Sequence, residues 1–299
     1  MQNAVKFTTT EPSTPTPGQV LRGRILRHKG VMVGGTVIAV IILIAILAPA
    51  LAPHDPYAQS LIRRLRPPVW IEGGSWAHPL GTDHLGRDYL SRLIYGAQIS
   101  LTIGVCTALI SGVVGTTLGV LAGYFGGWVD AVITFFVTVK LSIPTILLAL
   151  AVVQLFGGSL NVVVLVLGFL LWHQFALVGR AVTMQIREMD YITAARTIGC
   201  SRSRILMTEV LPNLMNQIIV VLTLTIASAI VIEAALSFLG VGVKPPLPSW
   251  GIMIAEGRAH IFFRPWLVMI PGVALFVLVL SINLLGDGLR DVTSPQGRS

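Results

Sequence analysis

The stretch QIIVVLTLTIASAIVIEAALSFL, residues 217–239, contains a single charged residue, Glu233. Because about 20 consecutive apolar residues span the hydrocarbon core of a bilayer as one helix, we predict a transmembrane helix here. Comparable apolar runs cover residues 31–51, 99–122, 129–156, 161–182 and 266–285, with Pro144 expected to kink the third of these. The sequence therefore predicts an all-α integral membrane protein with about six transmembrane helices.

The composition of the whole chain agrees with this prediction. Hydrophobic residues make up 54% of the chain and charged residues only 11%, whereas a soluble domain carries roughly 25% charged residues. So few charges cannot cover a water-facing surface, so we expect much of the surface to face lipid. The net charge of +8 suits anionic lipid and cytoplasmic loops. No Lys/Arg-rich run with interleaved aromatic residues indicates nucleic-acid binding.

Polar stretches divide the chain into four parts. Residues 1–20, rich in proline and threonine, are predicted to be a disordered cytoplasmic tail. Residues 21–98 hold the first transmembrane helix and an external segment. Residues 99–291 form the transmembrane core, with a cytoplasmic segment at 187–212, and residues 292–299 form a second cytoplasmic tail. Both termini are placed in the cytoplasm because the first helix has a basic flank, Arg22, Arg24, Arg27 and Lys29.

Signals for catalysis and metal binding are missing from the sequence. Cys106 and Cys200 are far apart, and neither belongs to a metal-ligand pair. No GxxxxGK[ST] phosphate loop, HExxH or GxSxG occurs. We therefore predict no catalytic residues, no bound metal and no cofactor for this chain.

The polar segment between the fourth and fifth apolar runs begins DYITAARTIG, residues 190–199. Asp190 is a suitable N-cap and Gly199 a suitable residue just after a helix end, so a helix of about two turns is predicted between them. Tyr191, Ala194, Ala195 and Ile198 follow helical spacing and share one face, which two alanines make shallow. Ser201 or Ser203 is expected to cap a second helix that reaches Leu211, with Pro212 marking the turn into the fifth span.

This segment resembles the EAA motif of bacterial ABC importer permeases. Thr193-Ala194-Ala195, Gly199 and Leu211-Pro212 have the spacing of that motif, while Thr193 replaces its glutamate and Glu209 its isoleucine. Other strings resemble the C-type permease subunit of the dipeptide, oligopeptide and nickel family. They are HPLGTDHLGRD (78–88), SRLIYG (91–96), AALSFLG (234–240), PPLPSWG (245–251) and NLLGDGLRD (283–291).

The resemblance implies a type I ABC importer permease fold in a prokaryotic plasma (inner) membrane. It implies a second, non-identical permease as partner, two ATPase domains on the cytoplasmic face, which bind the ATP, and an extracytoplasmic substrate-binding protein. The helix formed by residues 191–198 would be the coupling helix that docks on one ATPase. Its coupling residues would be Tyr191, Thr193, Ala194, Ala195, Ile198, Gly199, Leu211 and Pro212.

Polar residues outside this segment have two interpretations each. Gly81, Asp83, Gly86, Arg87 and Asp88 form either an external docking or gating element or an Asx-turn held by salt bridges. Lys140, His173 and Glu233 lie in predicted spans, where ionisable residues are costly and usually face the bundle interior. We favour an ion pair of Lys140 with Glu233 or Asp130 over a position on the transport path, an interhelical hydrogen bond for His173, and helix clamping for Glu233.

The predicted function is passage of short peptides, driven by partner ATPases. Import of nickel or another small ligand by the same fold remains the nearest alternative. A membrane anchor for a redox complex is a different class, and it would usually need two facing axial histidines, whereas His173 is the only histidine in a predicted span. A secondary transporter would not need the segment at 187–212.

Overall fold

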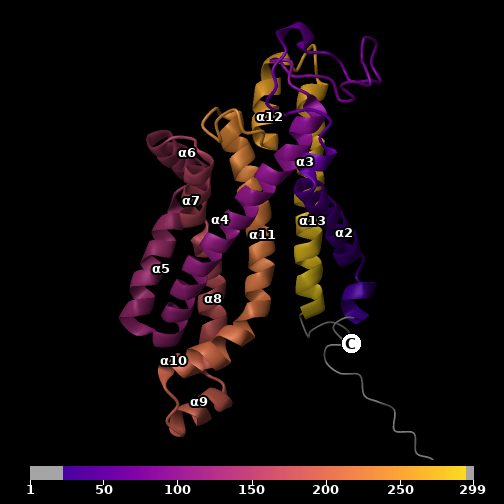
Figure 1. Cartoon of the computed structure of the whole chain (residues 1–299). Helices are drawn as coiled ribbons and strands as arrows, with labels where there is room; N and C mark the ends of the chain where they lie inside the picture. The colour runs from indigo at the N-terminus through magenta and orange to yellow at the C-terminus, as the bar shows by residue number, and fades with distance from the viewer. Residues whose placement is uncertain (1–22, 294–299) are drawn as a thin grey trace, which may run out of the picture.

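The computed structural model describes residues 23–293, which are helical apart from connecting loops and two isolated β-bridges. Element labels follow Figure 1. In chain order the elements are α2 (Lys29–Ile46), α3 (Ala48–Leu51), η1 (Leu61–Arg63), α4 (Tyr89–Phe125), α5 (Gly127–Ser142), α6 (Thr145–Phe156), α7 (Leu160–Leu170), α8 (Trp172–Arg187), α9 (Asp190–Thr197), α10 (Arg202–Ile205), η2 (Leu206–Val210), α11 (Leu211–Phe238), α12 (Trp250–Gly257), η3 (Arg258–His260) and α13 (Trp266–Thr293).

The long helices agree with the predicted membrane spans. Five helical stretches of residues 23–293 are long and apolar enough to cross a bilayer: 29–46, 89–125, 160–187, 202–238 and 266–292. The pair α5 and α6 makes a sixth if its two bent halves count as one span. The prediction of about six spans is therefore confirmed, with the third one broken.

The break between α5 and α6 is sharper than the kink predicted at Pro144. The two helices meet at an angle of 89°. Proline disfavours the helical conformation of the residue before it, and Ile143 is accordingly extended, with φ −108° and ψ 124°. Pro144 then caps α6 without a side-chain hydrogen bond.

Helices α4 and α8 pack closely through a stripe of glycines. Gly115, Gly119 and Gly123 recur every four residues on α4, so they lie on one face of the helix. A Cβ atom at these positions would lie 2.1, 2.5 and 2.7 Å from backbone oxygens of α8. Small residues permit such close approach of helices in membranes, and this contact forms the centre of the bundle.

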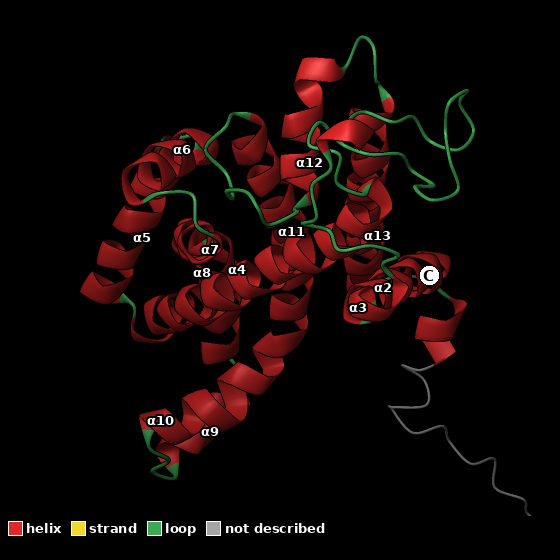
Figure 2. Ribbon diagram, turned by 45° about the horizontal axis from the view of Figure 1, so that its top comes forward, coloured by secondary structure: helices red, strands yellow, loops and turns green. Residues whose placement is uncertain are grey.

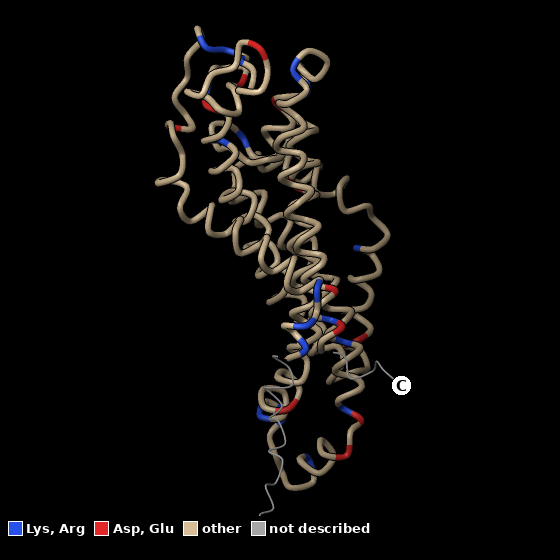
Figure 3. Tube along the Cα trace, turned by 90° about the vertical axis from the view of Figure 1, so that its right-hand side faces the viewer, with Lys and Arg blue, Asp and Glu red and all other residues tan. Residues whose placement is uncertain are grey.

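Two polar ends enclose an apolar middle. The loop at residues 52–88 and α12 lie at one end, and α9 and α10 lie at the other (Figure 1). Loops collect around α12 (Figure 2), while lysine, arginine and acidic residues gather at the two ends and leave the middle nearly uncharged (Figure 3). This distribution suits a protein whose middle faces hydrocarbon.

The predicted tails have little structural description. Residues 1–20 lie outside the described residues, and so do residues 294–299 of the second tail. The last helix is longer than predicted, since α13 continues past residue 285 to Thr293.

Candidate functional site

Helix α9 forms where the sequence predicts it, but its cap differs. Met189 is the N-cap and makes no side-chain hydrogen bond, whereas Asp190 is the first helical residue. The prediction of Asp190 as the N-cap is therefore wrong. The Asp190 carboxylate instead lies in the first turn, where it favours the positive end of the helix dipole. Gly199 has φ +85°, a conformation that costs other residues about 1 kcal/mol or more.

The face predicted from the helical spacing is largely exposed. Tyr191, Ala194 and Ile198 are exposed, with 80% of Ile198 accessible, and Ala195 is partly buried. Ile192, which the sequence reasoning did not single out, is fully buried in a cluster built from α4, α8, α10 and α11. Helix α9 is thus fixed to the bundle on one side and presents a shallow apolar surface on the other.

The chain beyond α9 continues as one helical stretch rather than turning at Pro212. Ser201 caps α10 by accepting a hydrogen bond from the Arg204 amide. One π-helical turn, η2, follows, and in it the Leu211 amide donates to the Leu206 carbonyl five residues earlier. Pro212 is the second residue of α11 and follows directly on this π-helical turn, so the helix accommodates it without ending. The predicted turn at Pro212 is therefore wrong.

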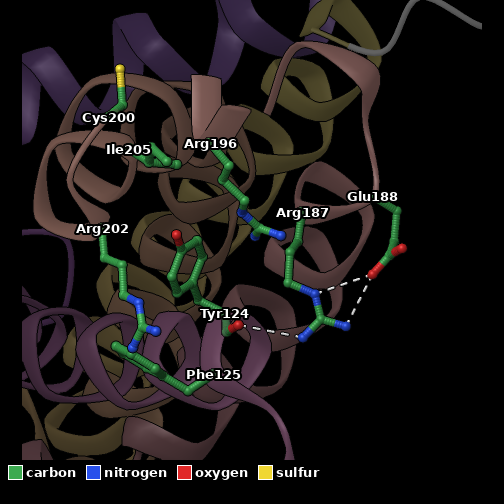
Figure 4. Close-up of a pocket in the computed structure, with 8 residues that line it drawn as sticks. All are labelled: Tyr124, Phe125, Arg187, Glu188, Arg196, Cys200, Arg202 and Ile205. Atoms are coloured by element: carbon green, nitrogen blue, oxygen red, sulfur yellow. Dashed lines mark hydrogen bonds and ion pairs between the residues drawn. The ribbon is translucent and has the colours of Figure 1, made fainter. Parts of the chain in front are cut away.

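A pocket of about 580 Å³ separates this segment from the end of α4. Figure 4 shows Arg187, Arg196 and Arg202 around the ring of Tyr124. The Arg187 guanidinium donates to the carbonyls of Gly123 and Tyr124, at 3.2 and 3.3 Å. The Arg196 guanidinium lies 5.3 Å from the Tyr124 ring centroid, within cation–π range. These contacts link the α9 segment to the end of α4.

A buried ion network occupies the opposite end of the molecule. Asp83 accepts from the Arg87 side chain at 2.6 Å and from Arg92. Both arginines also bind Glu256 of α12, at 3.0 and 2.6 Å. Asp83 further accepts from the amide of Leu85, two residues on, at 2.8 Å. The loop therefore contains an Asx-turn held by salt bridges, one of the two interpretations given for it from the sequence. Arg92 and Glu256, which were not predicted as site residues, complete the network.

The charge state of Asp83 follows from this environment. Burial raises the pKa of its carboxyl, but the charges of Arg92 and Arg87 and the hydrogen bonds from Arg87 outweigh burial. The net effect holds the Asp83 pKa below its ordinary value. His84 next to it is half-buried, and desolvation lowers its pKa. At neutral pH the Asp83 carboxyl is therefore ionised and the His84 imidazole is neutral.

The remaining predicted loop residues shape the start of α4. Asp88 caps α4 by accepting from the Ser91 amide and hydroxyl, at 2.8 and 2.7 Å, and it also bonds His78. Gly81 and Gly86 have φ +80° and +76°, and a Cβ on either would lie within 2.3 Å of a loop carbonyl. These residues hold the loop in one conformation.

Within residues 23–293, two groups of side chains bring potential metal ligands together. Ligand atoms of His54, His78 and Asp88 lie within 4.8 Å of one another, as do those of Asp83, His84 and Glu256. In the second group both carboxylates already bind guanidinium groups. The first group is therefore the better candidate to hold a cation, although the Asp88 carboxylate is already engaged by His78 and the α4 cap.

Lys140 does not form the predicted ion pair. It is 8% exposed, in the last turn of α5, and its Nζ donates to the Thr145 hydroxyl at 2.9 Å. Asp130 binds Arg180 instead, with one contact of 2.6 Å. Glu233, the other expected partner, is likewise engaged elsewhere. The favoured pairing of Lys140 with an acid of this chain is therefore wrong.

Glu233 and His173 both make hydrogen bonds to neighbouring elements. Glu233 is 1% exposed and accepts from the hydroxyls of Ser237 and Ser249, at 2.7 and 2.9 Å. Ser249 is the N-cap of α12, so Glu233 ties α11 to the start of α12. The His173 Nδ1 atom lies 3.1 Å from the carbonyl oxygen of Leu170, at the end of α7.

Two family models match the chain, each over a different range of residues. Residues 115–298 match the model of the binding-protein-dependent transport system inner membrane component. Residues 16–68 match the N-terminal TM domain of oligopeptide transport permease C.

Curated relatives match almost the full length. The chain is 40% identical to the dipeptide transport system permease protein DppC of Haemophilus influenzae, over 94% of this chain and 95% of that protein. It is also 40% identical to the di/tripeptide transport system permease protein DppC of Pseudomonas aeruginosa, over 94% and 93%. A third relative is the glutathione transport system permease protein GsiD of Pectobacterium atrosepticum, 40% identical over 97% and 94%.

Solved structures show the same fold. An inward-facing structure of the MetNI methionine ABC transporter aligns with a TM-score of 0.57 and 20% identity, over 68% of this chain and 97% of that chain. The family model covers more than half of the chain, and the relatives match it nearly end to end. The chain therefore belongs to the binding-protein-dependent transport system inner membrane components, the permease subunits of bacterial ABC importers.

Proposed function

We propose that the chain forms, with a second and similar permease, the path by which short peptides cross the inner membrane of a bacterium. Two ATPase domains on the cytoplasmic face drive transport, and an extracytoplasmic binding protein delivers the peptide. The evidence for a peptide substrate comes from the names of the three relatives. They are permeases for dipeptides, for di- and tripeptides, and for glutathione. All three cargoes are short peptides, which favours peptides over nickel.

The exposed face of α9 is the ATPase-docking surface in this proposal. Tyr191 and Ile198 give it apolar area and Ala194 keeps its middle shallow, which suits insertion into a cleft. Ile192 anchors the opposite side of the helix in the bundle, so a displacement of α9 is passed to the spans. A ligand-driven closure of the ATPases would in this way shift the helix bundle between two states.

A transport measurement tests the substrate. Vesicles that hold the complete complex should accumulate labelled di- and tripeptides when ATP and loaded binding protein are supplied, and should accumulate none with a non-hydrolysable ATP analogue. A nickel chelate offered under the same conditions is the competing cargo. ATP-dependent uptake of the chelate, with no uptake of peptides, would overturn the peptide proposal.

The proposed orientation places the α9 end in the cytoplasm, because the first helix has a basic flank. Cys200 lies partly exposed in the α9 segment, whereas Cys106 lies within α4. In vesicles of known sidedness that lack the ATPases, a membrane-impermeant maleimide should modify Cys200 only from the cytoplasmic side. Cys106 should stay unmodified from either side. Modification of Cys200 from outside would reverse the orientation.

A further inference from the structure

Lys140 is a buried cation without an acidic partner. Among residues 23–293 no carboxylate lies within 4.0 Å of its Nζ atom, and the neutral hydroxyl of Thr145 accepts its hydrogen bond. An ammonium group offers three donors, so further donors remain for another acceptor. A buried charge without a counter-charge is costly, and ionisable residues kept within spans usually serve a function.

Lys140 lies far along α5 from the start of that helix. It lies thirteen residues after the start of α5 at Gly127, which is about 20 Å along the helix. The hydrocarbon core is only about 30 Å thick. With the start of α5 at one surface of this core, the Lys140 Cα atom would lie about two-thirds of the way across it.

Lys140 lies between two helix ends, the last turn of α5, whose carbonyl end favours a cation, and the start of α6. The 89° break sets the N-terminus of α6 next to it, and Pro144 caps this end without a side-chain acceptor. The positive end of a helix dipole favours negative charge. The acids that the sequence suggested as partners, Asp130 and Glu233, are occupied by other groups. No acidic side chain among residues 23–293 thus pairs with this cation, and the partial negative charge at the end of α5 is its nearest compensation.

Lys140 also lines an open cavity of about 450 Å³, several of whose wall residues, Phe136 among them, are exposed in this chain. The walls come from α4, α5, α6 and the start of α8, and every lining residue other than Lys140 is apolar or aromatic. Cavities of about 300–1,000 Å³ with apolar walls and a few polar groups are typical of sites for small ligands. The cavity therefore suits a ligand with apolar parts and one anionic group.

We propose that Lys140 binds the C-terminal carboxylate of the peptide as it passes through the permease, while the cavity accepts the adjoining apolar side chain. The inference rests on the proposed peptide function. The α-carboxylate is the anionic group that unmodified peptides share whatever their side chains. An acid of the second permease is the competing partner, but it would need no apolar cavity beside the cation.

The experiment compares two forms of one labelled tripeptide, with a free C-terminal carboxylate and with a C-terminal amide. The complete complex is reconstituted in vesicles, and both forms are supplied at concentrations that saturate the binding protein. The variants are Lys140→Met, Lys140→Gln and Lys140→Arg. The control is Lys244→Met, which removes an exposed lysine from the loop before α12. The readout is the ratio of ATP-driven uptake of the two forms.

Loss of a charge-assisted hydrogen bond should lower the uptake ratio of free acid to amide about tenfold or more in Lys140→Met and Lys140→Gln. Lys140→Arg should restore most of the ratio, and Lys244→Met should leave it unchanged. An unchanged ratio in Lys140→Met and Lys140→Gln would overturn the inference. So would a fall in the yield of the two-permease complex that Lys140→Arg reverses, since this result indicates an acid on the partner. If the wild-type complex takes up neither form, the peptide function itself has failed.

Discussion

Replacement of Gly199 by valine should abolish transport, while the permease should still enter the membrane and bind its partner permease. Gly199 has φ +85° with open space around its Cα atom. A branched side chain is strained there by at least about 1 kcal/mol, so the end of α9 must rearrange. Replacement of Ala194 by tryptophan should act by a different route, since Ala194 is exposed and a large side chain would hold the ATPase surface away.

The measurement is paired: ATPase subunits retained on purification, and ATP hydrolysis stimulated by loaded binding protein. Both should fall to background in Gly199→Val and Ala194→Trp. The matched control is Gly240→Val, because Gly240 has φ +84°, equally open surroundings, and a place at the far end of α11. Ala194→Ser is the control for position 194, because it changes the residue without adding a large side chain. Normal retention and stimulation in both test variants would show that α9 is not the coupling helix.

Removal of the Asp83 carboxylate should destabilise the permease by about 3–5 kcal/mol, the usual cost of breaking a buried ion pair from one side. Asp83→Ala leaves the guanidinium groups of Arg87 and Arg92, 2% and 0% exposed, with Glu256 as their only remaining acidic partner in the network. Glu72→Ala removes an exposed acid from the same loop and should change stability by less than about 0.5 kcal/mol. Thermal unfolding of the purified complex compares the two variants.

The pH dependence of stability gives a second readout of the same carboxylate. The Asp83 pKa is lower in the folded protein than in the unfolded chain, so its contribution is present above the unfolded value of about 3.9. The contribution is lost as the pH falls through the folded pKa. Wild type should therefore lose stability on acidification below about pH 4, and Asp83→Asn should lack this component. Parallel acid curves would show that Asp83 does not contribute in this way.

Local patterns in the sequence predict the spans and α9, because apolar runs and helical spacing act within one segment. They also locate the break at Pro144, but its 89° angle depends on distant contacts, since α5 packs against α4 and α8 whereas α6 packs against α7 and α11. The burial of Ile192 depends on helices that lie elsewhere in the chain. The partners of Arg92 show the same limit, since Glu256 is 164 residues away in sequence. Long-range contacts of this kind leave no periodic signal.

The incorrect partner for Lys140 has the same origin. Asp130 and Glu233 are acids within predicted spans, which made them reasonable partners for Lys140. In the structure, however, Asp130 binds Arg180, and Glu233 accepts hydrogen bonds from two serines. A sequence lists which charges are available without saying which of them meet.

The glycines on α4 are synthesised well before α8, the helix against which they pack. Helix α4 is complete at Phe125, whereas its partner α8 is complete only at Arg187, about 60 residues later. At a synthesis rate of about 5–20 residues per second, the delay is about 3–12 s. During this interval Gly115, Gly119 and Gly123 have no helix to pack against. A ribosome stalled between these two points would therefore leave a nascent chain in which the glycine face of α4 lacks α8, its partner in the folded protein.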